Sequence, residues 1–195
     1  MLYRFLVGLG RPLGWAVFRP RVTGRAHLPR HGGIVVCPNH LSGFDVLAVG
    51  FAVGLRPLRS MAKNQLFRRP LLGPFVRSLG GFPARSEDRL PGGIDEAAAL
   101  AAAGEAILIF PEGARRRGRS RRPRTGAART ALAAGVPLVP VAIRGTDGWR
   151  RLHRWQVVFG PPVPLDDLAG LPPQEAAREA TRRLWERVTT LEAGL

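Results

Sequence analysis

Short apolar runs alternate with longer helical patterns along most of this 195-residue chain. The clearest runs are rich in Val, Ile and Leu and carry no charge, which is typical of strands buried in a parallel sheet. Candidate strands lie at 22–24, 34–37, 58–62, 81–84, 106–110, 137–143 and 156–159. Strands that alternate with helices predict an α/β fold with a mostly parallel mixed sheet covered by helices. The chain length fits a single domain.

The helical segments are marked by their composition and by the residues that end them. The segment 90–103 is alanine-rich and acidic near its start, and Gly104 stops it. Pro70 and Pro74 divide the segment 65–79 into a pair of short helices. Further helices are expected at 43–55, 126–134 and 174–191.

Two other prolines fall where the hydrophobic pattern would otherwise continue. Pro12 lies inside the apolar and aromatic segment 2–18, and we expect it to break or kink this segment into two short helices. Pro140 lies inside the strand at 137–143 and predicts a sheet edge or a bulge there, because proline donates no ladder hydrogen bond.

The N-terminal segment 1–20 has two interpretations. It could lie in a bilayer interface with Trp15 and Phe18 at headgroup depth, or it could cover the core of the domain formed by 21–195. No uncharged run reaches about 18 residues, so no transmembrane helix is expected. A signal peptide is also not expected, because no small-residue cleavage site follows a clean apolar stretch.

The chain is strongly basic, with 30 Lys and Arg against 14 Asp and Glu and a formal net charge of +16. Such a charge indicates an anionic partner, which could be nucleic acid, an anionic membrane surface or a phosphorylated substrate. The arginine-rich segment 115–124 has no interleaved aromatic residues for base stacking, so nucleic acid is not the expected partner. The single cysteine, Cys37, rules out an internal disulfide framework. No cysteine or histidine cluster has metal-ligand spacing, and no metal site is expected.

Polar residues with useful chemistry follow several of the predicted strands. They are His40 after 34–37, Lys63 after 58–62, Arg85 after 81–84, and Glu112 with Gly113 after 106–110. Because the carboxyl ends of parallel strands lie at one edge of a sheet, these groups could converge. A histidine paired with a carboxylate is a general base, whereas lysine and arginine bind phosphate. The combination describes a site that deprotonates a hydroxyl group on a phosphorylated molecule.

His40 and Asp45 can meet only in one local arrangement. Positions i and i+5 of a regular helix lie about 140° apart, so His40 must lie in the loop and Asp45 in the first helical turn. A structural alternative fits the same residues, with Ser42 as N-cap and Asp45 reaching back to the Ser42 amide in a capping box. On that alternative, His40 is an incidental loop residue.

Four ordered blocks in this sequence resemble those of the 1-acylglycerol-3-phosphate acyltransferases and the wider glycerolipid acyltransferases. The blocks are 39–45 (NHLSGFD), 80–85 (GGFPAR), 110–115 (FPEGAR) and 136–141 (VPLVPV). The likeness runs from about 22 to 162, with a motif-bearing core of about 34–147. Two positions depart from the family pattern, since Ala114 stands in place of the usual threonine and Arg116 in place of a common serine.

The resemblance implies a fold of the glycerol-3-phosphate acyltransferase type and assigns roles to the residues above. His40 would be the general base and Asp45 would orient its ring. Lys63 and Arg85 would hold the phosphate of the acceptor. Glu112 and Gly113 would shape the glycerol site, although Glu112 could instead pair with an arginine (Arg85 or Arg115). Backbone N–H groups at the helix start after His40 would bind the oxyanion.

The resemblance also implies the reaction and its partners. The donor would be acyl-CoA or acyl carrier protein, the acceptor lysophosphatidic acid, and the product phosphatidic acid, with no separate cofactor. Another lysophospholipid or a glycolipid is an alternative acceptor, and a basic nucleic-acid-binding protein is a more distant alternative. The apolar N-terminal segment and the net charge, rather than the resemblance, predict that the enzyme sits on the cytoplasmic face of the cell membrane as a peripheral or monotopic protein, in contact with its anionic surface.

Overall fold

A seven-stranded sheet forms the centre of the part of the chain that the structure, a computed structural model, describes: residues 2–54, 56–84, 92–116 and 122–195. Its strand order is β1-β7-β6-β2-β5-β3-β4. The strands are β1 Arg21–Thr23, β2 Ile34–Pro38, β3 Leu58–Lys63, β4 Gly81–Ala84, β5 Ala106–Leu108, β6 Leu138–Arg144 and β7 Gln156–Phe159. The α-helices are α1 Leu2–Phe18, α2 Asp45–Val53, α3 Asn64–Phe67, α4 Leu72–Ser78, α5 Gly93–Ala102, α6 Gly126–Ala134 and α7 Pro173–Ala193. Short 3₁₀ helices are η1 Arg25–His27, η3 Trp149–Arg151 and η4 Asp166–Leu168.

The sheet is mixed but mostly parallel, as the alternation of strands and helices predicts. Strands β2 to β6 run in the same direction, so their carboxyl ends lie along one edge. Strand β7 runs antiparallel to β6, and β1 pairs in parallel with β7. The predicted α/β fold class is therefore confirmed.

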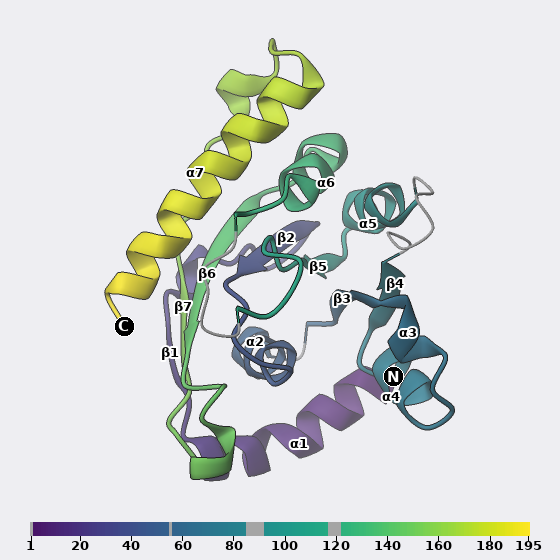
Figure 1. Cartoon of the computed structure of the whole chain (residues 1–195), viewed down its shortest axis with the longest axis vertical. Helices are drawn as coiled ribbons and strands as arrows, with labels where there is room; N and C mark the ends of the chain where they lie inside the picture. Colours follow the sequence, from purple (N-terminus) through teal and green to yellow (C-terminus); the bar gives the residue numbers. More distant parts are fainter. Residues whose placement is uncertain (1, 55, 85–91, 117–121) are drawn as a thin grey trace.

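Strand β2 has no exposed residue because both faces of the sheet are covered around it. Ile34 and Val36 face a cluster that includes α2, β6 and β7, whereas Val35 and Cys37 face a cluster that includes α5, α6 and α7. Figure 1 shows the two layers, with α5, α6 and α7 on one side of the sheet and α2 with α1 on the other. This double burial explains why the segment is continuously apolar rather than alternating.

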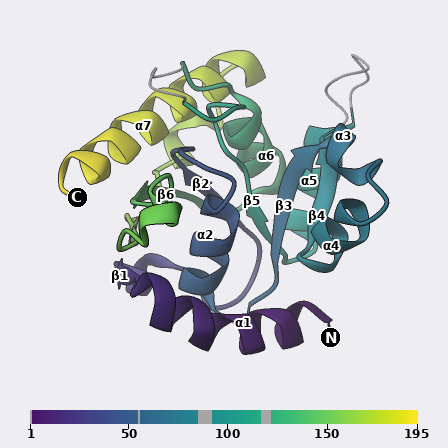
Figure 2. The ribbon, with the colours of Figure 1, turned by 60° about the horizontal axis from the view of Figure 1, so that its bottom comes forward.

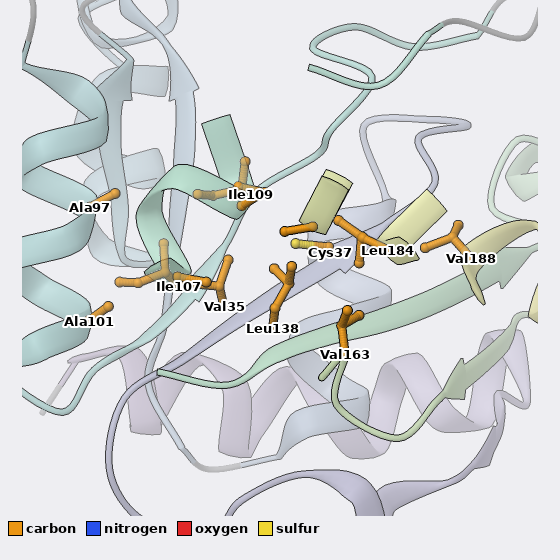
Figure 3. Close-up of a cluster of buried hydrophobic side chains, with 14 of the residues drawn as sticks. Val35, Cys37, Ala97, Ala101, Ile107, Ile109, Leu138, Val163, Leu184 and Val188 are labelled. Atoms are coloured by element: carbon orange, nitrogen blue, oxygen red, sulfur yellow. The ribbon is translucent and has the colours of Figure 1, made fainter. Parts of the chain in front are cut away.

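Small side chains let the helices on the α5–α7 side pack closely on the sheet. Figure 3 shows Ala97 and Ala101 of α5 beside Ile107, while Leu184 of α7 lies beside Cys37. Val188, further along α7, belongs to the same cluster. Helices α6 and α7 also pack on each other and on β6. The C-terminal helix is therefore built into the core of the domain.

Helix α1 is continuous across Pro12, so the prediction of two separate short helices is wrong. Packing on α2 explains the difference: a Cβ added at Gly14 would lie 2.4 Å from the Phe51 ring, which shows how closely the two helices approach. The proline removes a single intrahelical hydrogen bond, and Gly8 and Pro12 both lie on the exposed side of the helix. None of the described helices combines the length and the hydropathy that a membrane-spanning helix needs.

Pro140 marks a bulge rather than a sheet edge. Strand β6 lies inside the sheet, between β7 and β2, so the predicted edge is wrong. Val141 pairs with Phe159, and Leu138 forms an isolated bridge with Val163. Two residues on β6 therefore face three on the partner segment, which is the arrangement of a β-bulge.

Most element boundaries lie within one or two residues of those predicted, and two of the larger differences are at β5 and α5. Strand β5 ends at Leu108, earlier than the predicted 106–110, although the Ile109 amide still donates to the Val36 carbonyl at 3.1 Å. Helix α5 begins at Gly93 rather than at 90. The residues just before it, 85–91, lie outside the described part of the chain.

Candidate active site

Several of the predicted site residues meet at the carboxyl edge of the parallel strands. His40 follows β2 and Glu112 follows β5, which is the neighbour of β2 in the sheet. The backbone N–H of His40 donates to Glu112 Oε1 at 3.1 Å. Lys63 is the last residue of β3, but its side chain lies outside the described part of the structure, as does Arg85.

The His40 and Asp45 side chains are in contact. His40 Nδ1 lies 2.8 Å from Asp45 Oδ2, with His40 in the loop and Asp45 as the first residue of α2. The His40 ring also stacks on Phe110, with centroids 4.0 Å apart. The Asp45 side chain is fully buried, whereas that of His40 is 17% exposed. A solvent-reachable imidazole is thus backed by a buried carboxylate.

The buried Asp45 carboxylate has hydrogen-bond donors on both oxygens, as a buried charge requires. Oδ2 accepts from His40 Nδ1 and from the backbone amides of Leu41 at 2.7 Å and Ser42 at 3.0 Å. Oδ1 accepts from the hydroxyl of Thr146, which follows β6. An ionised carboxylate only accepts hydrogen bonds, so the contact assigns a proton to Nδ1 of His40, and in the neutral imidazole this leaves the lone pair on Nε2.

The capping-box alternative is half right. Asp45 does accept the Ser42 amide, as that alternative requires. The N-cap position, however, is Phe44, and the Ser42 hydroxyl accepts from the Phe44 amide at 3.1 Å instead of capping the third helical residue. Asp45 therefore has both a structural contact with the loop and a contact with His40.

The loop amides just after His40 are already occupied. The N–H groups of Leu41 and Ser42 donate to Asp45, and that of Phe44 donates to the Ser42 hydroxyl. These three amides already have acceptors within the protein, and the binding of the oxyanion by N–H groups at the start of α2 stays a prediction. The cause of these contacts is the inward turn of Asp45, whose buried charge attracts the nearest N–H groups.

Glu112 is buried and forms an ion pair with Arg116. Arg116 Nε donates to both carboxylate oxygens, at 2.8 and 2.9 Å. This partner differs from the predicted candidates, Arg85 and Arg115. Gly113 has a left-handed φ of 68°, and a Cβ there would lie 3.1 Å from Arg124 Nε, so a glycine suits this turn.

Four residues to which the sequence patterns assign no role in the site also belong to this region. Asn39 is fully buried and joins β2 to β6: its Nδ2 donates to the Ile143 carbonyl at 2.9 Å, and its Oδ1 accepts from the Ile143 amide at 2.7 Å. Thr146, Arg116 and Glu192 complete the group. Asn39, Thr146 and Glu192 contact partners that are distant in the chain, so no local spacing points to these contacts. Arg116 lies four residues from Glu112, and its departure from the family pattern is the signal that points to it.

The arrangement suits general-base chemistry on a hydroxyl group. A neutral imidazole with its Nδ1 proton held by a carboxylate can take a proton at Nε2, and the carboxylate then stabilises the imidazolium. Both backbone groups of His40 are also held, because its carbonyl accepts from the Arg116 amide at 3.0 Å while its amide donates to Glu112.

Comparisons with known proteins agree with this chemistry. Residues 19–144 match the family model described as Acyltransferase. The chain is 30% identical over 175 residues to the 1-acyl-sn-glycerol-3-phosphate acyltransferase of Bacillus subtilis, covering 88% of this chain and 87% of that protein. It is 28% identical over 180 residues to the protein of the same name from Streptococcus pneumoniae, covering 86% of this chain and 65% of that one.

A solved structure has the same fold. The crystal structure of the 1-acyl-sn-glycerophosphate (LPA) acyltransferase from Thermotoga maritima superposes with a TM-score of 0.72 at 22% identity. The match covers 98% of this chain and 81% of the other. The mixed sheet with its helical layers is therefore an architecture already seen in an enzyme.

Proposed function

This chain belongs to the Acyltransferase family, and from that premise we propose that it acylates 1-acylglycerol-3-phosphate (lysophosphatidic acid) to give phosphatidic acid. The acyl donor is acyl-CoA or acyl carrier protein. The observation that carries the proposal is the contact between His40 and the buried Asp45 at the carboxyl edge of the sheet. The relatives in Bacillus and Streptococcus, both named for this reaction, support the choice of acceptor.

In the proposed mechanism, His40 is the general base. Its Nε2 takes the proton of the acceptor hydroxyl as the oxygen attacks the thioester carbonyl of the donor. The tetrahedral intermediate then collapses, the C–S bond breaks, and the imidazolium returns the proton to the departing thiolate. The substrate alcohol is the nucleophile, so no enzyme serine takes part. Asp45 keeps the ring in the needed tautomer and stabilises its charged form.

The acceptor phosphate is proposed to bind Lys63 and Arg85. Lys63 is the last residue of β3 and pairs in register with Ala84, the last residue of the adjacent strand β4. Arg85 follows Ala84 in the sequence and lies outside the described residues. A pair of cations at such a position suits a phosphate group. Glu112 and Gly113 are proposed to shape the glycerol site from the neighbouring strand β5.

Helix α1 is proposed to lie in the interface of an anionic membrane surface, on the cytoplasmic face of the cell membrane, as a peripheral or monotopic contact. The support is an exposed apolar stripe at helical spacing: Phe5, Leu9 and Leu13 are 64%, 69% and 68% exposed. The opposite side of the helix packs on Phe51 of α2. A helix that covers the core on one side and leaves three large apolar residues exposed suits a bilayer interface. On this proposal, both sequence interpretations of the segment 1–20 hold together.

His40→Ala tests the mechanism. The variant should lose acyl transfer by at least about 10³-fold, because removing the base leaves only binding and orientation. The measurement is thiol release from purified protein, with circular dichroism to check the fold. His31→Ala is the matched control, because His31 is an exposed histidine outside the site. Near-normal turnover by His40→Ala would refute the assignment of the base.

The same assay defines the substrates. Acyl-CoA and acyl carrier protein are offered as donors, and lysophosphatidic acid, other lysophospholipids and a glycolipid as acceptors. The proposal expects the highest kcat/KM with lysophosphatidic acid. A clear preference for another acceptor would keep the chemistry and change the substrate.

A further inference from the structure

The last turn of helix α7 reaches the catalytic loop through Glu192. Its Oε1 accepts from Arg116 Nη1 at 2.6 Å and from Asn39 Nδ2 at 3.2 Å. These two donors belong to the loops after β5 and β2, which carry the site. One carboxylate oxygen on the C-terminal helix therefore joins both loops.

Arg116 passes this contact on to His40. Its Nε donates to both oxygens of Glu112, whose Oε1 also accepts from the His40 amide. The backbone N–H of Arg116 itself donates to the His40 carbonyl at 3.0 Å. Arg116 thus binds the His40 carbonyl directly and the His40 amide through Glu112, and the Arg116 side chain is itself held by Glu192.

The surroundings of Arg116 fix it in this position. Its side chain is only 17% exposed, and its guanidinium lies 5.5 Å from the centre of the Trp185 ring. Trp185 belongs to α7 and packs against the core. Burial lowers the pKa of Arg116, but its hydrogen bonds to Glu192 and Glu112 outweigh burial and raise this pKa overall. A guanidinium with two carboxylates and an aromatic face is held rigidly, and it is not free to bind a substrate phosphate.

Asn39 receives the second contact and is equally constrained. The same side chain that donates to Glu192 also forms two hydrogen bonds with the backbone of Ile143 in β6. Asn39 directly precedes His40 in the chain. Movement of Glu192 would therefore also displace the His40 backbone through Asn39.

We infer that Glu192 is a positioning residue for catalysis, which holds Arg116 and Asn39 and through them sets the place of the His40 backbone. If so, helix α7 has two functions: it covers one face of the sheet, and its last turn positions the catalytic loop. The inference rests on the proposed role of His40 as the base. Misplacement of a reacting group by about 1 Å is enough to cost on the order of 10²-fold in rate.

The experiment compares Glu192→Ala, Glu192→Gln and Glu186→Ala. Glu192→Ala removes both the charge and the acceptor, and kcat should fall by about 10-fold or more while KM for each substrate stays within about twofold. Glu192→Gln keeps an acceptor oxygen without the charge, so its kcat should lie between those of the wild type and Glu192→Ala. Glu186 lies on the same helix with an exposed side chain that pairs with Arg182, so Glu186→Ala should match the wild type.

A second measurement follows His40 directly, independently of activity. The ring signals of His40 in an NMR spectrum, assigned with His40→Ala, should shift and broaden in Glu192→Ala, while those of the exposed His31 and His153 stay unchanged. Normal kcat together with unchanged His40 signals would overturn the inference. Equal loss in all histidine signals would show a general loss of structure and would also overturn it.

These outcomes separate the inference from the proposed function. If the wild-type protein transfers no acyl group to any acceptor, the proposed function fails. If the wild type is active and His40→Ala is inactive while Glu192→Ala keeps its kcat, only the role of Glu192 fails.

Discussion

Asp45 carries the most demanding set of contacts of any single residue in the site. Its carboxylate is fully buried and accepts from His40, from two backbone amides and from Thr146. Each of these donors needs an acceptor, so the charge of Asp45 organises the loop and the base at once. Even a substitution that keeps the size of the Asp45 side chain should therefore lower the rate of catalysis.

Asp45→Asn should lower kcat strongly, although the asparagine side chain has nearly the same size and shape as the aspartate side chain. The asparagine amide group would face N–H donors, so either the loop or the His40 tautomer must change; a comparable change in a serine-protease triad costs about 10⁴-fold. We expect a loss of about 10³- to 10⁴-fold in kcat. Asp147→Asn is the matched control, because Asp147 is an exposed aspartate next to Thr146. A variant within about tenfold of wild type would show that Asp45 serves the loop and not the base.

The sequence reveals only part of the site at the residue scale. His40 and Asp45 are five residues apart, and Glu112 follows the clearest strand, so local patterns find all three. Thr146 lies 101 residues from Asp45, and Glu192 lies 153 residues from Asn39. Such pairs are made by the strand order and by the docking of α7, which no local spacing encodes. Lys63 and Arg85 stay predictions, because their side chains lie outside the described part of the chain.

At the scale of elements, hydrophobic pattern predicts the strands well and proline is the main source of error. The strand at 156–159 has the predicted bounds, and helix α7 extends the predicted 174–191 by a few residues. At Pro12 the expected division into two helices does not occur, because α1 packs on α2, whereas at Pro140 the expected bulge is present and the expected edge is not. Tertiary packing decides such cases, and single-sequence patterns do not contain it.

Helix α1 gives a prediction at this scale. Replacing Phe5, Leu9 and Leu13 together by serine should weaken binding to anionic vesicles by about 100-fold or more, since fully burying one such side chain is worth roughly 1.5–3 kcal/mol. The melting temperature should change little, because these side chains are exposed and the α2 contacts of α1 are kept. Flotation with vesicles measures the binding.

The control for this prediction is a single exposed leucine elsewhere. Leu9→Ser should reduce flotation measurably, whereas Leu171→Ser, at an exposed leucine just before α7, should not. In Figures 1 and 2 the loop before α7 lies far from α1. Unchanged flotation of the triple variant would place the membrane contact on another surface.

At the scale of the whole molecule, charge and burial act together. The formal net charge is +16, and several carboxylates, among them Glu105, Glu112 and Glu192, are already paired with arginines of the protein. The excess of arginine charge is therefore left to attract anionic surfaces over a Debye length of about 8 Å at physiological salt. Vesicle binding should then combine this salt-sensitive attraction with the salt-insensitive insertion of α1.

The single cysteine offers a test of how cooperatively the molecule is held together. Cys37 is fully buried under the α5–α7 layer (Figure 3), and burial raises the pKa of its thiol, which disfavours the reactive thiolate. At pH 8 the native protein should react with a thiol reagent at least about 1,000-fold more slowly than the unfolded chain, given a stability of roughly 5–15 kcal/mol.

The dependence of this labelling on urea tests whether α7 can leave the sheet by itself. Leu184 and Val188 of α7 lie in the same cluster as Cys37, so the thiol stays protected only while α7 is docked. If α7 belongs to the same cooperative unit as the sheet, labelling and far-UV circular dichroism should show the same urea midpoint. Labelling at lower urea would mean that α7 detaches first, carrying Glu192 away from Arg116. In that case acyl transfer should disappear at the labelling midpoint and not at the unfolding midpoint.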